Sequence, residues 1–544
     1  MSFGDYLEID LTLTIGGTAH VIPGGNVKLL ELTLASYGFS GVIELVLADD
    51  STHGGGETDG LLADFQTANL IEVAVSVATV FPAPEAASTL TPVSVAGIAT
   101  QRSVEEGMHM TAQDRAVLWR RYRIEFTDPA RVLWGQHFPC ALYTATTLTA
   151  VIDDHKGSKI TITYDGDAWS AAQPLVFLNL VPEAGASFYD FVVWYTDAYA
   201  AVFAYDYTAA GYTLRAAKDA TGTAVELFGD DVSRLRVVFP EVPRYKANVL
   251  NSYAAAQTST AVDNAQGIDT IRHDFLMRSA IAQDATDRVT VETSRLITRL
   301  SELRIEMRRW PSVDFPPGAL ISFNAGNLWP SNGLQVGTTW RVRRHEIRAR
   351  SQRQGPDADH DEPKAMFDVE VRAELEQQGE TWVERPAYVR PTWPGYVEGT
   401  VVSAQGEDDE LTYQYYENAD TSLNEYNVTV PVFAAQVVTA PYDPHQGSGK
   451  MYMPIHKTER VLLAIDFLKA SIARQLDWRD GALAAMDAQG ERIFFGKKSG
   501  AATMVDHSYD DSKPVFSITR TNDTDTGTIT ISEGSLVIQV KESS

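Results

Sequence analysis

The sequence has 544 residues, with 45 basic and 72 acidic side chains and a formal net charge of -27. Apolar residues make up 44% and charged residues 22%, which is typical of a folded chain rather than a disordered one. At about 100–200 residues per domain, this length predicts roughly three to five domains. Nucleic acids and anionic membranes attract proteins through Lys and Arg, so the strongly negative charge argues against both as partners.

Cys140 is the only cysteine, which excludes an intrachain disulfide framework and every cysteine-rich metal site. Its neighbours in segment 138–142 are apolar, so we expect a buried structural thiol rather than a nucleophile. Residues 1–5 show neither a basic nor an apolar signal region, and no apolar run reaches the roughly 20 residues of a membrane helix. We therefore expect synthesis in the cytoplasm without a signal peptide.

Most of the sequence alternates between apolar and polar residues, the pattern of half-buried strands. These runs are rich in β-branched and aromatic residues and are separated by Gly, Asp and Pro turns, which is typical of barrels or sandwiches. In chain order the clearest predicted strands are residues 27–34, 41–47, 71–77, 122–126, 159–164 and 367–371. The sequence therefore predicts a mainly β fold.

Helices are few, and the clearest begins at Ser187. Asp190 follows three residues later as its capping-box partner. Large apolar side chains recur at helical spacing: Phe188, Phe191, Val192, Tyr195, Tyr199 and Val202. Aromatic residues at this spacing usually form core rather than a ligand site, so we expect this face to be buried.

Three segments rich in Gly, Pro or polar residues interrupt the strand pattern. Residues 50–60 are expected to form a loop within the first domain, and residues 351–364 a loop between two strands. Residues 385–395 contain three prolines and predict a stiff linker at a domain border.

The sequence contains almost no catalytic motif: there is no His-Glu-x-x-His, no Gly-x-Ser-x-Gly and no Gly-x-Gly-x-x-Gly opening a helix. Residues 447–450 imitate the end of a phosphate-binding loop, but Pro444 and Met451 replace its first glycine and its hydroxyl residue, so we predict a turn. His155 and His360 stand beside aspartates in segments that are typical of polar loops, where adventitious cation binding competes with an ordinary solvated loop. No catalytic, cofactor-binding or metal-ligating residue is predicted, and we do not expect an enzyme.

Charge is distributed unevenly along the chain. Residues 1–100 hold twelve acids and one base, whereas residues 271–350 hold thirteen arginines and eight acids. Such asymmetry indicates either complementary surfaces in an assembly or separate solvated faces, and the sequence leaves both interpretations open.

The N-terminal half shows a distinctive order of segments. Residues 32–47 predict an opening strand pair, residues 95–98 a strand that contains glycine, and residues 122–129 a strand of the pattern Tyr-x-hydrophobic. Residues 188–195 then predict a short helix, and residues 201–206 begin a strand pair rich in Tyr and Phe.

The order continues with strands at residues 317–323 and 340–346, and then with a series of strands from Gly395 onward. That series is predicted at residues 395–402, 426–431, 449–454 and 460–467. Together these segments resemble the VgrG-type hub-and-spike proteins of contractile injection systems, a family shared with phage tail hubs. The resemblance extends over most of the chain and is one of pattern rather than of a single sharp motif.

The sequence departs from the family at two places. The acidic Asp-Gly-Asp-rich turn expected after residue 467 is missing, and residues 468–476 stand in its place. The C-terminal needle is very short, and no lysozyme-like insert or toxin extension follows the expected OB-fold. The resemblance therefore favours an extracellular, phage-tail-like system or a phage-derived particle over a type VI secretion spike that carries an effector domain.

The C-terminal strands can also be interpreted without the family. Alternation in residues 528–532 and 535–540 places five apolar side chains on one face: Ile529, Ile531, Leu536, Ile538 and Val540. A lone two-stranded hairpin is marginally stable, whereas three copies around an axis would bury this face and pair the strand edges. We predict that these five residues form a trimer and needle interface; packing against the chain's own OB-fold is the alternative.

The resemblance implies two hub β-barrels with a small α+β insertion, an OB-fold and a short intertwined β needle, assembled as a homotrimer. The expected ranges are 1–150 for the first hub barrel, 151–245 for the α+β hub subdomain, 246–384 for the second hub barrel, 385–504 for the OB-fold spike base and 505–544 for the needle.

The implied function is mechanical. The trimer would join a hexameric inner tube to the needle tip and pierce the target envelope, as part of an assembled particle that is released or fired extracellularly. The implied partners are the inner tube protein, baseplate components and a PAAR-type tip protein, with no cofactor and no nucleic acid. A cell-surface carbohydrate-binding or adhesin-like β protein is the alternative, and a polysaccharide-degrading enzyme on a trimeric β scaffold is a third hypothesis.

Overall fold

The computed structural model divides into two compact units. The first unit holds Met1–Pro139, Thr149–Ala171 and Leu180–Pro391, and the second holds Cys140–Leu148, Ala172–Asn179 and Thr392–Ser544. The structure describes residues 2–50, 58–84, 90–110, 116–166, 169–219, 221–402, 415–419, 421–442, 453–484, 486 and 490–542. Strands dominate the described residues, which confirms the predicted mainly β fold.

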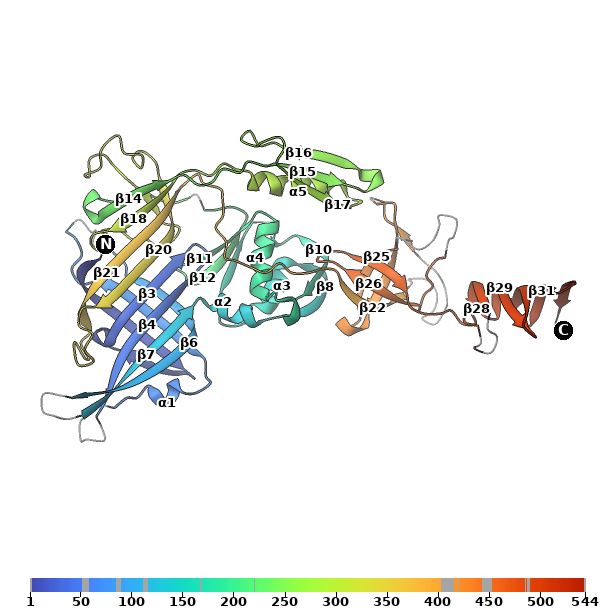
Figure 1. Ribbon diagram of the computed structural model, residues 1–544, viewed down its shortest axis with the longest axis horizontal. Helices are drawn as coiled ribbons and strands as arrows, with labels where there is room; N and C mark the ends of the chain where they lie inside the picture. The colour runs from blue at the N-terminus through green and yellow to red at the C-terminus, as the bar shows by residue number, and fades with distance from the viewer. Residues whose placement is uncertain are drawn as a thin grey trace. The chain divides into compact units, whose positions relative to one another are not determined.

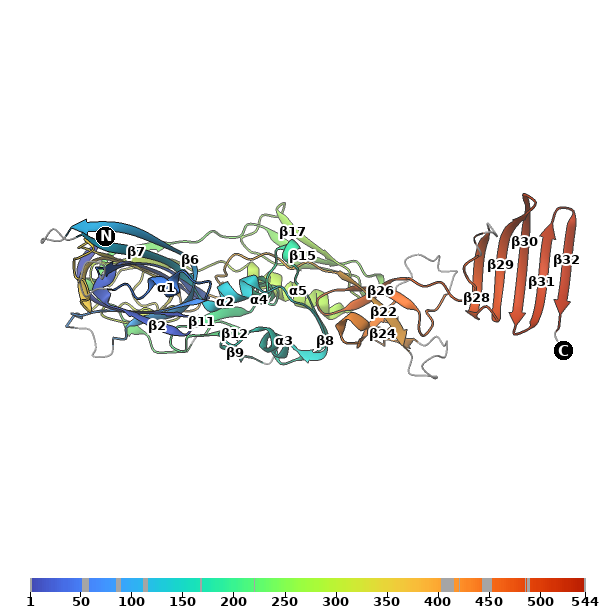
Figure 2. The ribbon, with the colours of Figure 1, turned by 90° about the horizontal axis from the view of Figure 1, so that it is seen from below.

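Eight antiparallel strands of the first unit close into a ring (Figures 1 and 2). Around the ring they are β20 (Trp340–Ser351), β3 (Val27–Ala35), β4 (Gly38–Asp49), β7 (Ala116–Thr127), β6 (Val93–Met110), β5 (Ile71–Thr79), β1 (Phe3–Ile15) and β21 (Lys364–Gln377). The ring closes because β21 pairs with β1 and with β20, while β20 also pairs with β3. All but one of the six clearest predicted strands lie in this ring; the exception, predicted at 159–164, is β9 (Ile162–Asp165) of another sheet.

Apolar residues at alternate positions of these strands fill the inside of the ring. Leu7, Ile9, Leu11 and Leu13 of β1 are fully buried, and the residues between them are more exposed. An eight-stranded barrel has an interior just wide enough for side chains to fill it. These side chains therefore form the packed core of the first unit.

The strands β20 and β21 continue beyond the ring into a second group of strands. There β21 pairs with β18 and β20 pairs with β19. The strands that complete this 13-stranded sheet are β2 (Thr18–Ile22), β13 (Val225–Glu226), β14 (Val232–Val238), β18 (Glu302–Met307) and β19 (Leu320–Ser322). Strands from the predicted ranges 1–150 and 246–384 thus belong to one sheet, in which β20 and β21 are shared.

The helix predicted at Ser187 is present as α4 (Phe188–Ala198). The Ser187 hydroxyl accepts a hydrogen bond from the Asp190 amide, and the Asp190 carboxylate accepts one from the Ser187 amide, which forms the expected capping box. Phe188 and Phe191 are fully buried, so the aromatic face is core, as expected.

The helix is shorter than its apolar spacing suggested. It ends at Ala198, with Tyr199 as its C-cap, and Val202 begins the strand β11 instead of extending the helical face. Tyr199 is half exposed because it lies past the last helical turn.

Two smaller α/β layers complete the first unit. One is the sheet of β11 (Val202–Asp206), β12 (Gly211–Arg215) and β9. The other is the sheet of β16 (Thr258–Val262), β15 (Lys246–Asn251) and β17 (Arg272–Met277), which packs against α5 (Ala282–Arg295) through a core around Ala247, Val262 and Leu296.

The remaining helices are short. They are α1 (Leu62–Phe65), α2 (Pro129–Leu133) and α3 (Leu148–His155), with 3-10 turns η1 (Gly24–Asn26), η3 (Trp134–Gln136), η5 (Pro182–Ala184), η6 (Gly229–Asp231), η7 (Ala254–Ala256) and η8 (Pro431–Phe433).

The second unit takes two strands from the middle of the chain, β8 (Cys140–Thr147) and β10 (Ala172–Asn179), which pair with each other. Its main sheet holds β22 (Gly395–Val402), β23 (Tyr416–Glu417), β24 (Asn424–Val430), β25 (Gln436–Pro441), β26 (Arg460–Ile465) and β27 (Ala470–Gln475). An isolated bridge from Tyr442 to Ile472 joins the β25 end of this sheet to β27, so the sheet curls into a small barrel. Leu142 and Phe177 of the β8–β10 pair share its apolar core.

Three sequence expectations for this unit have separate outcomes. The segment 468–476 is a strand, β27, where the family pattern has an acidic turn. Residues 449–452 of a predicted strand lie outside the described residues. The expectation of a buried Cys140 is wrong: Cys140 is exposed, because it is the first residue of β8 and pairs with Asn179 at the open end of that strand pair.

The C-terminal part of the second unit is an antiparallel sheet whose strands follow one another in chain order. They are β28 (Glu491–Lys498), β29 (Ala501–Asp510), β30 (Lys513–Asn522), β31 (Asp525–Ser532) and β32 (Ser535–Lys541). The sheet begins at Glu491, earlier than the needle range 505–544 expected from the sequence.

Candidate functional site

The C-terminal sheet β28–β32 is the first candidate site. Tight turns connect its consecutive strands. Asp511 and Ser512, between β29 and β30, both have positive φ angles, 49° and 63°. Two-residue hairpin loops with positive φ match the right-handed twist of the strands that they join. Figure 2 shows the five strands side by side in one layer.

One face of this sheet carries large apolar side chains on all five strands, although Glu491, Thr503, His507 and Arg520 also lie on it. Cross-strand pairing places Ile529 opposite Ile538, and Ile531 opposite Leu536. The same face continues through Ile518, which pairs with Ile529 and with Val505. Its large apolar side chains, here called the apolar face, are Ile493, Phe495, Val505, Tyr509, Phe516, Ile518, Ile529, Ile531, Leu536, Ile538 and Val540.

The five residues predicted to share a face therefore do so. The extension of the apolar face to β28, β29 and β30 was missed from the sequence, because adjacent apolar residues such as Phe494 and Phe495, or Met504 and Val505, obscure the alternation there. Whether these side chains form an interface between chains remains a prediction.

The opposite face is mainly hydroxylated and charged. Its members, here called the polar face, include Arg492, Asp506, Ser517, Thr519, Thr521, Thr526, Thr528, Thr530, Gln539 and Lys541, and they are interrupted by Phe494, Met504, Val515 and Val537. Arg492 forms an ion pair with Asp506 on this face. The sheet is therefore amphipathic.

The apolar face is bare, most of all toward the C-terminus. Leu536 is 64%, Ile538 71% and Val540 73% exposed. Complete burial of one such side chain contributes about 1.5–3 kcal/mol, and contiguous apolar patches of this kind mark interaction sites. The outer edge of β32 also has no strand partner among the described residues, so the sheet offers both a face and an edge for association.

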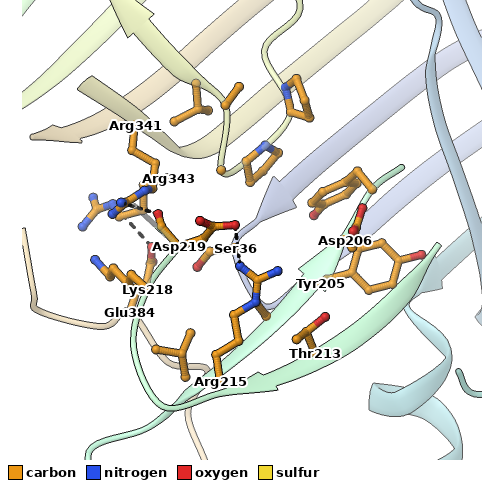
Figure 3. Close-up of a pocket in the computed structure, with 18 of the residues that line it drawn as sticks. Ser36, Tyr205, Asp206, Thr213, Arg215, Lys218, Asp219, Arg341, Arg343 and Glu384 are labelled. Carbon is orange, nitrogen blue, oxygen red and sulfur yellow. Dashed lines mark hydrogen bonds and ion pairs between the residues drawn. The ribbon is translucent and has the colours of Figure 1, made fainter. Parts of the chain in front are cut away.

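A pocket in the first unit is the second candidate site, with a volume of about 360 Å³ (Figure 3). The hairpin β11–β12, the segment 316–319 and β20 enclose it. Figure 3 shows Arg215, Lys218 and Asp219 facing Arg341 and Arg343. Because these segments are far apart in the sequence, no local pattern predicts the pocket.

The charges in this pocket are matched by neighbours within the chain. Lys218 Nζ lies 2.7 and 2.8 Å from the two carboxylate oxygens of Glu376, and Arg341 reaches the same carboxylate at 3.2 Å. Arg215 pairs with Asp219 at 2.9 Å, and hydrogen bonds from Thr221 hold the pKa of Asp219 at about 2. Burial lowers the pKa of Lys218. The ion pairs hold the elements around the pocket together.

Some acidic residues of the N-terminal hundred form ion pairs within the chain. Acidic residues of the N-terminal hundred pair with later bases: Glu31 with Arg348 at 2.8 Å, Glu72 with Lys159 at 2.6 Å, and Glu44 with Arg123 at 2.6 Å. Of these pairs, only Glu31–Arg348 joins the acidic residues 1–100 to the arginine-rich residues 271–350, so both interpretations of the uneven charge stay open.

The histidines noted in the sequence lie in different surroundings. His155 is the last residue of α3 and not part of a loop, because the apolar residues before it form a helix. His360 lies in a turn, 3.3 Å from the Asp361 carboxylate, with its ring against Trp119. Residues 447–450 lie outside the described residues.

Within the described part of the chain, no cluster of three or more His, Cys, Asp or Glu side chains is arranged to hold a metal ion. None of the described helices is both long and apolar enough to span a membrane.

The fold is similar to that of chains in structures of a PdpA–VgrG complex. In the lidded complex from Francisella, the match has 13% identity and a TM-score of 0.73 and covers 99% of this chain and 80% of the other. In the lidless complex, identity is again 13%, the TM-score is 0.74 and coverage is 99% of both chains. A 43 kDa tail protein of prophage MuSo2 from Shewanella oneidensis matches 68% of this chain and 98% of its own, at 12% identity and a TM-score of 0.43.

No family model matches the sequence, and no curated protein matches it either. At 13% identity the likeness to the PdpA–VgrG chains establishes the fold, which extends over nearly the whole chain, and it confirms the β-rich, hub-like class expected from the sequence.

Proposed function

We propose that the chain is the hub and spike of a contractile injection system and acts as a homotrimer. Its hub would join a hexameric inner tube, its C-terminal sheet would form a needle, and a PAAR-type protein would cap the tip. Baseplate components would hold it in a phage-tail-like particle that acts outside the producing cell. The fold shared with chains of the PdpA–VgrG complex supports this proposal.

The bare apolar face of the C-terminal sheet carries the proposal. A single amphipathic layer has nowhere to bury Ile529, Ile538 and Val540 within its own sheet. Three copies around an axis would turn these faces inward and leave the polar faces toward water. The free edge of β32 would then lie beside a strand of a neighbouring copy.

We propose for the spike the parts that were expected from the sequence, and the strand order supports this division. The ring of eight strands would supply the first hub barrel, and the strands shared through β20 and β21 the second. The small barrel formed by β22 and β24–β27 would be the OB-fold at the base of the spike, because five antiparallel strands close through the bridge of Tyr442 and Ile472.

The proposed action is mechanical rather than catalytic. When a surrounding sheath contracts, the needle would be driven through the target envelope. The hydrophobic effect is non-directional, so apolar surface buried between chains would stabilise the trimer along the whole sheet. Such an interface suits a shaft that must stay assembled under load.

The native mass of the full-length protein tests the proposal, measured by light scattering after gel filtration. A trimer has a mass near 180 kDa, three times 59.7 kDa. The decisive pair of variants changes neighbouring residues on opposite faces of β32: Ile538→Glu on the apolar face and Gln539→Glu on the polar face. We expect the first to release monomers and the second to remain trimeric.

A wild-type protein that stays near 60 kDa at all concentrations would remove the needle interface and favour the adhesin-like alternative. Equal trimer stability in both variants would also contradict the proposal, because it would show that the apolar face is not the contact surface.

A further inference from the structure

Two histidines that are 18 residues apart in the sequence meet in the first unit. The Nε2 atom of His137 lies 2.9 Å from the Nδ1 atom of His155, so one ring donates a hydrogen bond to the other. His137 follows η3, and His155 ends α3. The sequence showed only the aspartates beside His155, whereas the structure supplies a second imidazole.

Surrounding contacts hold the two histidines next to each other. Phe188, which is fully buried, packs against both, with ring centroids 5.6 Å from His137 and 5.3 Å from His155. The Phe188 amide donates to the His137 carbonyl at 2.8 Å. The Trp134 indole N–H donates to the Lys156 carbonyl at 3.1 Å, which ties η3 to the end of α3. The two nitrogens therefore converge because three elements hold them together.

Imidazole nitrogens such as those of His137 and His155 are common metal ligands in proteins. Both rings are partly exposed, so an ion can reach them. Burial lowers the pKa of His137, and burial together with the neighbouring His137 lowers the pKa of His155. Neutral imidazole is the form that binds metals. The positive charge of the nearby Lys156 forms an ion pair with the Asp153 carboxylate, 2.8 Å away.

We propose that His137 and His155 form a two-imidazole binding site for a divalent transition metal ion of the Zn(II), Ni(II) or Cu(II) class, which favours imidazole nitrogen. Metal–nitrogen bonds of about 2.0–2.1 Å place two ligand nitrogens about 3.3 Å apart in a tetrahedral site. The two nitrogens need to separate by a few tenths of an ångström, and the rings need to turn so that both lone pairs point at the ion instead of along the line between the nitrogens. The proton between them moves to the other nitrogen of the ring that carries it, so no net proton is lost.

The ion would have open coordination positions. Within the described ranges, no third His, Cys, Asp or Glu completes a cluster with the pair, so water would occupy the other positions. Such an ion exchanges readily and stabilises the contact between α3 and η3. This inference does not depend on the proposed function.

Zinc titration of the full-length protein, stripped with EDTA and followed by calorimetry, tests the site. We expect one Zn²⁺ ion per chain and a higher melting temperature with zinc. His137→Gln and His155→Gln should each weaken binding at least tenfold, because each removes one of two ligands. The matched control is His360→Gln, a histidine that also stands beside aspartates, and its variant should bind zinc like the wild type.

Electron paramagnetic resonance of the wild type with one equivalent of Cu²⁺ gives an answer even if a variant fails to fold. Coupling to two imidazole nitrogens supports the site, and its absence overturns the proposal. Zinc binding that is unchanged in both His137→Gln and His155→Gln, or no zinc binding by the wild type, also overturns it.

Discussion

The Nζ atom of Lys28 donates a hydrogen bond to the Ala358 carbonyl, 2.7 Å away and 330 residues further along the chain. Lys28, which is 1% exposed, also donates to the Gly25 carbonyl at 2.9 Å. Beside it, Asn26 Nδ2 donates to the Asp361 carboxylate at 3.1 Å, and the Asp361 amide donates to Asn26 Oδ1 at 2.7 Å. These contacts, here called the clasp, fasten η1 to the loop between β20 and β21.

We expect Lys28→Met to lower the free energy of unfolding by about 1–3 kcal/mol, because two buried carbonyl groups lose their donor. Amide hydrogen exchange in residues 352–363 should become faster at the same time. Urea unfolding and exchange mass spectrometry measure these effects. Lys364→Met is the control, since Lys364 forms only a half-exposed ion pair with Glu8, and equal losses in both variants would argue against the clasp.

Gly25→Ala tests the same clasp by adding a side-chain atom where the loop backbone lies close, and it leaves the charges unchanged. A Cβ atom at Gly25 would lie 1.9 Å from the Asp359 backbone oxygen, so the loop would have to move. We expect a loss of about 1–3 kcal/mol in unfolding free energy. Gly107→Ala serves as the control because nothing lies within 4 Å of its added Cβ, and thermal unfolding should separate the two variants.

His345 of β20 makes the fold sensitive to acid. The residue is 2% exposed, and neither ring nitrogen has a hydrogen-bond partner in the part of the chain that the structure describes. Burial lowers its pKa to about 4. An unfolded histidine has a pKa near 6.5, so between about pH 6.5 and 4 the unfolded chain binds a proton that the folded chain rejects.

The stability of the wild type should therefore fall as the pH drops through this window, with His345 contributing up to about 3 kcal/mol of the loss. His345→Leu should flatten this part of the profile. The measurement is the urea midpoint of both proteins from pH 7.5 to pH 4. Parallel profiles would show that another group controls the acid sensitivity.

If the proposed trimer and tip contact exist, removal of residues 490–544 should leave the ring of eight strands folded but weaken that trimer and abolish that contact. The cut precedes β28, so it removes the C-terminal sheet as a whole and leaves no half-sheet behind. Circular dichroism, native mass and binding of a PAAR-type protein check the three expectations. A truncated protein that keeps its trimer stability and tip binding would place both functions elsewhere in the chain.

Local patterns made much of this fold predictable. Alternation located most strands of the ring, although β1 was not among the predicted strands, and the Ser187–Asp190 pair located the start of α4. Both signals depend only on neighbouring residues. The helix α5 carries no such signal: its N-cap is Ile281, which has no side-chain capping bond.

Contacts over long sequence distances were not predictable. The sharing of β20 and β21 between the ring and the second group of strands follows from their length and register, which alternation does not encode. The β8–β10 pair alternates like any other strand pair, so nothing local assigns it to the second unit. The apolar face was predictable at Ile529 and Ile538, whereas the His137–His155 pair was not.

The ring of eight strands has a consequence for how the chain is made. Its first six strands end at residue 127, but the two that close it lie at Trp340–Ser351 and Lys364–Gln377. During synthesis the edges of β1 and β3 stay open until the ribosome has passed residue 377, while about two hundred residues of other structure emerge in between. Closure over such a long sequence separation is slow, and open strand edges promote aggregation. The nascent chain thus spends a little under half of its translation, from residue 127 to residue 377, as an open sheet whose exposed edges are β1 and β3.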